Sequence, residues 1–359
     1  MTLDPLLNSK NVAGISMGYK LMLRTRLSKL LGIEFPIFSA PMGPDLAGPD
    51  LAAAVSGAGG LGLMQAQLSP PADFREQIQR VREATDKPFG VNFILALPHE
   101  ENLSVCLEER VPVISFFWGE PARYVERVHA AGSRVFLQVG SVEAARRAAA
   151  AGVDVIIAQG TEAGGHVEGE VATMALAPRI VDAVAPLPVA VAGGIADARG
   201  VVAALALGAE AVVLGTRFLA TREANAHPEY KQKLLEACEK DTVRTILFGH
   251  GWPNAPHRTL RTSFVEQWLG NESRAQESRP DEPVIGKTWI GGREIPIQRF
   301  MSFPPSAHVT GNIDSMALLA GQAVGLVNEI KPAASVVREL ADGASRLIEQ
   351  RLGSLVSGV

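Results

Sequence analysis

Cysteine and long hydrophobic runs are both nearly absent from this sequence. It has two cysteines, Cys106 and Cys238, which are far apart and lack the spacing of a zinc site, so we expect neither a disulfide framework nor a metal. No apolar run is long enough to cross a bilayer, and the N-terminus carries Asp4, Lys10 and Lys20 where a secretory signal would be apolar. We therefore expect a cytoplasmic protein with no membrane partner.

Positive charge and aromatic side chains are also scarce. The formal net charge is -4, and the chain holds 3 Tyr and 4 Trp against 35 Gly. Because proteins that bind nucleic acid usually carry a basic surface, nucleic acid is not an expected partner. What is present is 47% hydrophobic content with 20% charged residues, the composition of a globular chain with a large core.

Eight short apolar runs recur along the chain, at residues 36–40, 60–64, 88–93, 111–116, 134–139, 153–158, 188–192 and 211–214. Helix-compatible stretches lie between most of them, at 49–56, 71–84, 121–131, 142–151, 173–184 and 196–207. Short runs that are apolar throughout are typical of strands buried on both faces of a parallel sheet. The alternation predicts an α/β fold, a (β/α)8 TIM barrel, and eight regular units favour this closed form over an open doubly wound sheet.

The sequence before and after these units has a different character. Residues 20–31 alternate basic residues with leucines, which predicts a helix that either plugs the bottom of the barrel or lies on its surface. Residues 223–310 are richer in Arg, Glu, Pro and aromatic side chains and predict an accessory region near the barrel mouth. Residues 311–330 and 333–352 predict two closing helices. We therefore divide the chain into 1–222, 223–310 and 311–359.

The stretch from Gln159 to His166 is the most informative, because it places a histidine on a glycine-rich loop directly after the run at 153–158. In parallel barrels the chemistry lies on loops that follow the carboxyl ends of strands. The neighbouring Gly164 and Gly165 leave room for a ligand to approach closely. His166 is therefore the candidate catalytic residue; a loop histidine satisfied by backbone carbonyls is the plainer alternative.

Three glycine-rich motifs bear on phosphate binding. Gly57 to Gly62 matches a dinucleotide fingerprint by letter, but a helix precedes it and a strand follows, the reverse of the required order, so we predict a packing turn. The other two, Gly193-Gly194 and Leu214-Gly215-Thr216, follow the seventh and eighth strands. Barrels of this kind hold a phosphate there on backbone N–H groups. Glycines that merely end strands are the alternative.

Other strand ends carry uncharged groups. Ala40-Pro41-Met42-Gly43 closes the first strand with a rigid turn, and Asn92 and Gln138 place amides at the third and fifth. Amides both donate and accept hydrogen bonds, which suits the mixed edge of an isoalloxazine, whereas an enzyme for sugar phosphates would more often present Lys or carboxylates. These groups favour flavin mononucleotide (FMN) as the phosphate-bearing ligand.

Together these motifs resemble the nitronate monooxygenase family, formerly called 2-nitropropane dioxygenases. The resemblance spans about residues 28–222, with a weaker echo at 314–325, and depends on the order and loop placement of the motifs. It implies a TIM-barrel flavoprotein that holds FMN without covalent attachment and oxidises alkyl nitronates with O2 to carbonyl compounds and nitrite. It also implies that Asn92, Gln159 and Gly164 contact the flavin, that Gly194, Gly215 and Thr216 hold its phosphate, and that His166 faces the substrate.

The full set of predicted cofactor-binding residues combines these with the strand-end motifs: Ala40, Pro41, Met42, Gly43, Asn92, Gln138, Gln159, Gly164, Gly165, Gly193, Gly194, Leu214, Gly215 and Thr216. A neutral His166 would remove the acidic carbon proton of a nitroalkane, and an imidazolium would stabilise the anionic nitronate. The same resemblance includes NAD(P)H-dependent quinone reductases and enoyl-thioester reductases. A ligand-binding barrel without catalysis is a third alternative, and a homodimer is left open.

The remaining histidines are weaker candidates. Three lie in polar stretches and are predicted at the surface: His99, His129 and His227. Three others fall in or beside the aromatic accessory segment: His250, His257 and His308. That segment would either cover the barrel mouth, shaping a substrate pocket with the aromatic residues 116–118, or form a peripheral packing layer.

Overall fold

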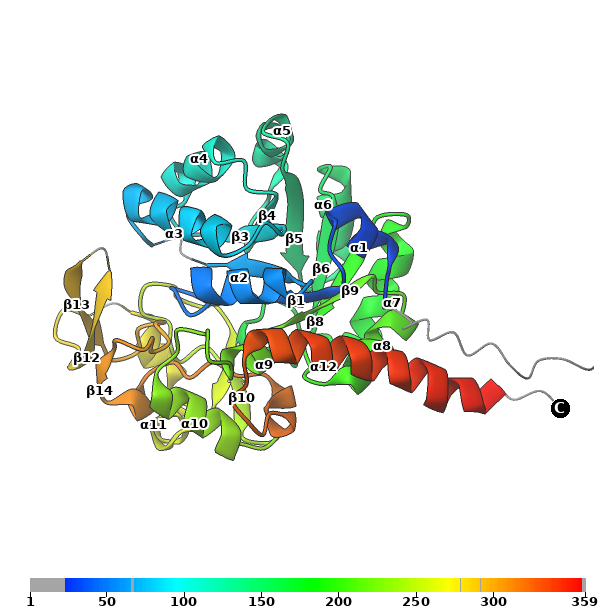
Figure 1. Ribbon diagram of the computed structural model, residues 1–359. Coiled ribbons are helices and arrows are strands. Elements are labelled where there is room, and N and C mark those ends of the chain that lie inside the picture. The colour runs from blue at the N-terminus through cyan, green and yellow to red at the C-terminus, as the bar shows by residue number, and fades with distance from the viewer. Residues whose placement is uncertain (1–22, 66–67, 278, 291, 357–359) are drawn as a thin grey trace, which may run out of the picture.

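The computed structural model describes residues 23–65, 68–277, 279–290 and 292–356. Eight parallel strands close into a barrel in which β1 hydrogen-bonds to both β2 and β9 (Figure 1). These strands are β1 (Ile37–Ser39), β2 (Leu61–Met64), β3 (Phe89–Ile94), β4 (Val113–Phe117), β5 (Arg134–Val139), β6 (Val155–Gln159), β8 (Val189–Ala192) and β9 (Ala211–Leu214). The closure confirms the (β/α)8 barrel and excludes the open sheet, which would have two edge strands each paired on one side only.

Helices follow the strands and cover the outside of the barrel. They are α2 (Pro49–Gly57), α3 (Pro71–Ala84), α4 (Glu100–Glu108), α5 (Ala122–Ala130), α6 (Val142–Ala150), α7 (Thr173–Val184) and α8 (Ala198–Ala206). Polar side chains fix several starts: the Ser141 hydroxyl accepts from Ala144 N–H at α6, and Asp197 accepts from Arg199 and Gly200 N–H at α8. Six of these helices match the predicted stretches, and α4 is an addition.

A packed core fills the barrel, and α1 (Arg26–Leu31) closes one end of it. Leu27 is fully buried there, in one cluster with the inward-facing Phe38 and Phe136, whose rings stack at 6.2 Å. Glu210, which directly precedes β9, accepts a hydrogen bond from Leu27 N–H at 2.8 Å. The helix therefore plugs the amino ends of the strands, which is the first of the two positions predicted for it, and does not lie on the outer surface of the barrel. It begins at Arg26, and residues 20–22 of the predicted span lie outside the described residues.

The dinucleotide-like motif at residues 57–62 is a packing turn between α2 and β2. A Cβ atom added at Gly62 would lie 2.2 Å from the carbonyl oxygen of Ala52 on α2, so only glycine permits this close helix-strand contact. The predicted packing turn is thereby confirmed.

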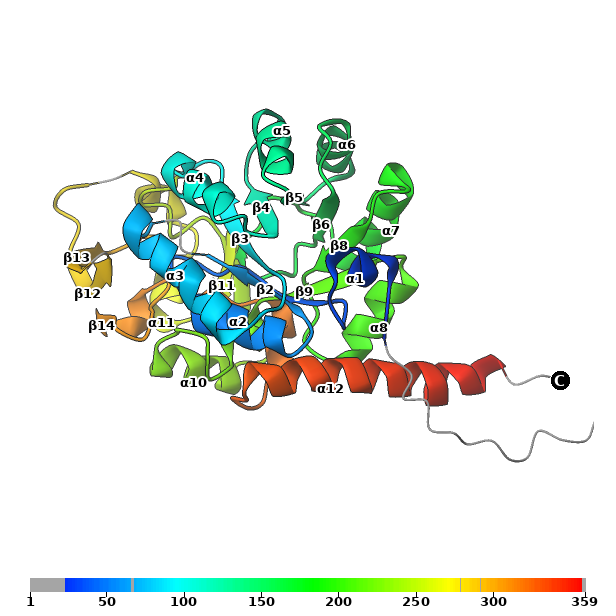
Figure 2. The same cartoon turned by 45° about the horizontal axis from the view of Figure 1, so that its top comes forward.

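The chain after β9 forms a short helix, α9 (Thr216–Leu219), and then two small sheets with helices around them. The first sheet, in the order β10-β11-β7, joins β10 (Thr242–Thr245) and β11 (His257–Leu260) to β7 (Gly165–His166), which belongs to the loop after β6. The second sheet contains β12 (Val284–Ile290), β13 (Arg293–Gln298) and β14 (Thr310–Gly311), at one edge of the molecule in Figures 1 and 2. The helices are α10 (Pro228–Glu236) and α11 (Ser263–Trp268).

The helix predicted at residues 311–330 is wrong. The segment instead holds β14 and two short 3-10 turns, Ile313–Ser315 and Gln322–Leu326. Its backbone N–H groups are used by the barrel loops, since Gly321 donates to the Thr216 hydroxyl at 3.0 Å and Gln322 to the carbonyl oxygen of Glu162 at 2.9 Å. A helix would need those donors for its own hydrogen bonds.

The second predicted C-terminal helix is confirmed as α12 (Ala333–Arg346), which continues into the turns of residues 347–356. It lies beside α8, on the side of the barrel opposite α4, α5 and α6 (Figure 2). Among the residues described, no helix combines the length and the apolar character needed to cross a membrane.

Candidate active site

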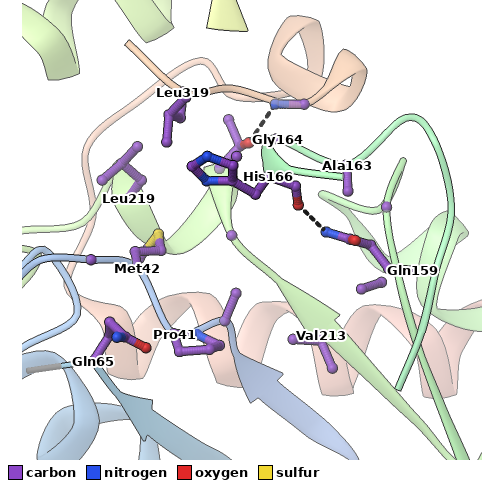
Figure 3. Close-up of a pocket in the computed structure, with 18 of the residues that line it drawn as sticks. Pro41, Met42, Gln65, Gln159, Ala163, Gly164, His166, Val213, Leu219 and Leu319 are labelled. Atoms are coloured by element: carbon purple, nitrogen blue, oxygen red, sulfur yellow. Dashed lines mark hydrogen bonds between the residues drawn. The ribbon is translucent and has the colours of Figure 1, made fainter. Parts of the chain in front are cut away.

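A cavity of about 1090 Å³, counted with its open mouth, lies at the carboxyl ends of the barrel strands (Figure 3). Each barrel strand, or the loop directly after it, contributes to its wall. The contributing residues are Ala40, Pro41, Met42 and Gly43 after β1, Gln65 after β2, Asn92, Phe117, Gln138 and Gln159 on β3 to β6, Gly193 and Gly194 after β8, and Gly215 and Thr216 after β9. The cavity therefore occupies the place where barrels of this class carry their chemistry.

The fold brings His166 and all but one of the predicted cofactor-binding residues to this cavity, including Gly164 and Gly165. The exception is Leu214, which packs into the layer between barrel and helices, while its neighbour Val213 faces the interior. Adjacent residues of a strand point to opposite faces, so only one of the two can line the cavity. The part that each residue plays in holding a cofactor stays a prediction.

Several lining residues are not singled out by the sequence. Gln65 contacts the amide of Asn92 at 2.7 Å, and its position directly after β2 is the signal that would have found it. Tyr230 of α10 donates a hydrogen bond to the carbonyl oxygen of Leu319 at 2.5 Å. Tyr230 and Leu319 both lie after the last barrel strand in the sequence, and no strand-end pattern marks them. Pro304, Gly321 and Ala323 join the wall in the same way.

Aromatic rings surround the side chain of His166. The indole of Trp252 stacks on the imidazole with ring centroids 4.0 Å apart, and His257 lies at 5.3 Å. Because His166 belongs to β7, its backbone also pairs directly with that of His257 on β11. Gln159 Nε2 donates to the carbonyl oxygen of His166 at 2.9 Å, which fixes the histidine to the end of β6 (Figure 3).

The surroundings of His166 keep its imidazole neutral. Burial lowers the pKa of His166 well below its ordinary value of 6.5, and the neighbouring His257 lowers it further. Burial also lowers the pKa of His257 to about 4. None of the described residues that line the cavity is Asp, Glu, Lys or Arg. At neutral pH the site therefore offers an uncharged base in an uncharged cavity.

Comparison with known proteins matches this architecture to a family model described as nitronate monooxygenase, over residues 24–103 and 95–343. The chain belongs to the nitronate monooxygenase family. A curated nitronate monooxygenase of Pseudomonas aeruginosa is 32% identical, with 88% of this chain and 98% of that protein covered.

Proteins with other names are at least as similar to this chain. A Mycobacterium tuberculosis protein named (3aS,4S,5R,7aS)-5-hydroxy-7a-methyl-1-oxo-octahydro-1H-indene-4-carboxyl-CoA dehydrogenase is 33% identical, with 89% of this chain and 95% of that protein covered. The solved structure of FabK from Thermotoga maritima has a TM-score of 0.77 and 37% identity, with coverage of 92% and 99%. Proteins similar to this chain thus carry the names of different enzymes, and similarity alone does not decide the substrate.

The family implies a flavin, and the cavity fits its ring. The Oε1 atom of Gln159 is buried and has no hydrogen-bond partner among the described residues. A buried acceptor without a donor is costly, so it points to a ligand that supplies an N–H group. The turn of Ala40 to Gly43 and the apolar side chain of Leu219 give the same cavity uncharged walls.

The loops after β8 and β9 fit a phosphate. Gly193 and Gly194 are consecutive residues with φ of +105° and +73°, a backbone that side-chain-bearing residues rarely adopt. Thr216 accepts a hydrogen bond from Gly321 N–H at 3.0 Å, so its own hydroxyl proton is available to a phosphate oxygen. Neither group carries a charge, and the anion would be held by neutral donors.

Two charged residues near these loops have structural roles. The carboxylate of Glu162 accepts from the backbone N–H and the hydroxyl of Thr173, so it caps α7. Arg217 is buried and donates to the carbonyl oxygens of Ala220 and Glu329. Neither lines the cavity.

The other histidines divide differently from the prediction. His99 is buried, between the carbonyl oxygen of Leu97 at 2.6 Å and the Tyr124 hydroxyl at 2.7 Å, so its surface assignment is wrong. His129 is exposed as predicted, and His227 caps α10. Of the accessory histidines, His257 reaches His166, whereas His308 is exposed.

Among residues 116–118, Phe117 lines the cavity and Phe116 packs outward.

Proposed function

We propose that this oxidoreductase uses FMN to oxidise nitroalkanes and their nitronates with O2 to carbonyl compounds and nitrite. The observation that carries the proposal is the neutral imidazole of His166 facing an uncharged cavity at the carboxyl ends of the barrel strands. The activity named by the family and by its Pseudomonas aeruginosa member supports the same chemistry.

The charge balance of the cavity favours a substrate that enters neutral. No lysine or arginine lines the described wall to attract an anion. A nitroalkane is a neutral carbon acid, and His166 would take the proton from its acidic carbon. The products of this transfer are an imidazolium and a nitronate, which stabilise each other as an ion pair inside a cavity that has no other charge to offer.

The remaining residues would hold the cofactor. Gln159 and Asn92 would bind the edge of the flavin ring, and the turn at 40–43 would lie along it. Gly194, Gly215 and Thr216 would receive the phosphate of FMN. A flavin bound there supplies an acceptor for the substrate's electrons, which O2 afterwards removes.

A second candidate is the oxidation or reduction of an acyl thioester with a nicotinamide as electron partner. The Mycobacterium tuberculosis relative is named as a dehydrogenase of a coenzyme A thioester. The carbon beside a thioester carbonyl also bears an acidic proton, so a neutral base beside a flavin would serve this reaction equally well.

Anaerobic stopped-flow absorbance separates the two candidates. The purified flavin-bound protein is mixed with a neutral nitroalkane, with an alkyl nitronate, and with NADH or NADPH. We expect rapid flavin reduction by the nitro compounds, then nitrite release and reoxidation when air is admitted. Reduction by a nicotinamide alone would contradict the proposal and favour the thioester reaction. Mass spectrometry of the released cofactor identifies it as FMN or not.

The variant His166→Asn tests the proposed base. Loss of a general base should lower kcat for a neutral nitroalkane by about 100-fold to 10,000-fold. A preformed nitronate no longer needs proton removal and should lose less. The control His308→Asn removes an exposed histidine and should leave both rates unchanged. Equal losses with nitroalkane and nitronate would show that His166 is not the base.

A further inference from the structure

The imidazole of His166 has little to hold it in place except neighbouring rings. It stands on the two-residue strand β7 beside Gly165, whose φ is +76°. Within the part of the chain that the structure describes, one hydrogen bond reaches its ring, between the Ser302 hydroxyl and Nε2, at a long 3.4 Å. A bond of that length constrains a side chain weakly. Orientation of the ring must therefore come mainly from packing.

Trp252 makes the shortest of the ring contacts of His166 among the described residues. Its indole lies on the imidazole with a centroid distance of 4.0 Å and an interplanar angle of 24°, a close stacked contact. Trp252 does not line the cavity, so it covers His166 from behind. It belongs to the loop between β10 and β11, so the accessory region supplies a wall for a barrel residue.

Trp118, which follows β4, supports Trp252 from a third part of the chain. The two indoles meet edge to face at 5.1 Å, and Trp118 also contacts the His166 ring at 6.0 Å and 84°. Trp118 has φ of +59°, which is strained for a bulky side chain. Strained residues persist where the surrounding packing requires them, and they are concentrated at functional sites. The strain indicates that the position of this indole matters.

We propose that Trp252 is a positioning residue that holds the imidazole of His166 toward the cavity, with Trp118 bracing it. The inference rests on the proposed function in one respect, that His166 acts on the substrate. It adds that the accessory region is a working part of the active site. The indole also excludes water from one face of the imidazole, which favours the neutral ring.

The groups that face the His166 ring determine how its pKa changes when the Trp252 indole is removed. His257, on β11, is the titratable neighbour, and Trp118, Trp252 and Ser302 bring no charge. Removing the indole therefore admits water without changing the charges around His166. The pKa of His166 should then rise toward its ordinary range.

The test uses Trp252→Ala and Trp252→Phe in the flavin-bound protein. The control is Trp289→Ala, which removes an exposed indole of β12 that is 45% accessible. The first readout is the NMR titration of the His166 ring, assigned with the His166→Asn variant. The second is kcat and KM for a neutral nitroalkane across pH. Both are compared with the parent protein.

In Trp252→Ala we expect the His166 titration to move upward and kcat to fall by about tenfold to 100-fold, with KM little changed, because misplacement of a reacting group lowers kcat. Trp252→Phe retains a stacking ring, so its His166 titration and its kcat should stay close to those of the parent. Should Trp252→Ala not fold, Trp252→Leu keeps apolar bulk without a stack and should show the same loss.

A folded Trp252→Ala or Trp252→Leu with the parent's kcat and the parent's His166 titration would overturn the proposal. A shifted titration in a protein that does not oxidise nitroalkanes would support the positioning role and reject the proposed function instead. The two failures are therefore distinguishable.

Discussion

At the scale of single residues, His166 combines a reactive side chain with surroundings that suppress its charge. Its pKa lies well below 6.5 because the ring is buried, and because His257 beside it would repel a second positive charge. A base works only when it is deprotonated, so the active form should predominate at neutral pH and be lost only in acid. This direction sets the pH dependence of the reaction.

We expect kcat/KM for a freshly dissolved neutral nitroalkane to stay constant as pH falls from 8 through 6.5. It should decline only at lower pH, when His166 finally takes up a proton. Initial-rate measurements across this range, with nitrite as product, check the prediction. A half-maximal rate at pH 6.5 or above would mean that His166 titrates like an exposed histidine.

Individual site residues could be predicted where the strand pattern places them. Asn92, Gln138 and Gln159 lie within one residue of the ends of apolar runs, and parallel strands bring such ends together. The prediction that Leu214 binds the cofactor comes from assigning the whole motif 214–216 together. Side chains alternate along a strand, and that of Leu214 points away from the cavity. The prediction that His99 lies at the surface is wrong because two hydrogen bonds satisfy its ring in the interior.

At the scale of elements, α1 stabilises the barrel from the end opposite the site. Leu27 is fully buried in the barrel core, whereas Leu30 on the same helix is 42% exposed. Leu27→Ala should therefore lower the free energy of unfolding by about 2–5 kcal/mol, while Leu30→Ala should change it by about 0.5 kcal/mol or less. Chemical denaturation of both variants measures the difference.

The same pair also tests whether α1 affects the chemistry. The helix contacts the amino ends of the strands, and the cavity lies at their carboxyl ends. We expect kcat of folded Leu27→Ala to equal that of the parent. Equal stability losses in the two variants would show that α1 does not plug the barrel.

Elements with a strong local signal could be predicted, and those held by distant contacts could not. The strands and most barrel helices follow from apolar periodicity. The helix α4 buries the polar Asn102 beside Leu103, Val105 and Cys106, which weakens its apolar pattern. Residues 311–330 look helical by composition, but their backbone bonds to barrel loops more than a hundred residues earlier in the chain.

At the scale of the whole molecule, the β7-β11 pairing joins the barrel and the accessory region around the half-buried His166 and the buried His257. His257 is fully buried; its Nδ1 lies 3.0 Å from the carbonyl oxygen of Ala255, and its Nε2 accepts from Phe248 N–H at 3.3 Å. Both ring nitrogens are engaged in the neutral state. A proton added at Nε2 would have to displace the N–H group of Phe248, so the fold resists protonation of His257.

This resistance predicts a loss of stability in acid. The pKa of His257 is about 4 in the folded chain, against an ordinary 6.5 in the unfolded one. Above pH 6.5 neither state binds the proton and no penalty exists. Between pH 6.5 and 4 the unfolded state binds a proton that the folded state refuses, so stability falls by up to about 3 kcal/mol. Below pH 4 this contribution stays constant.

Urea unfolding at pH 7.5 and pH 5 measures the effect in the parent and in His257→Gln. The variant starts from a different stability, but it lacks the titrating ring, so its stability should fall less between the two pH values. His308→Gln, which removes an exposed histidine, should fall as much as the parent. If His257→Gln and the parent lose equal stability on acidification, His257 is not held neutral by the fold.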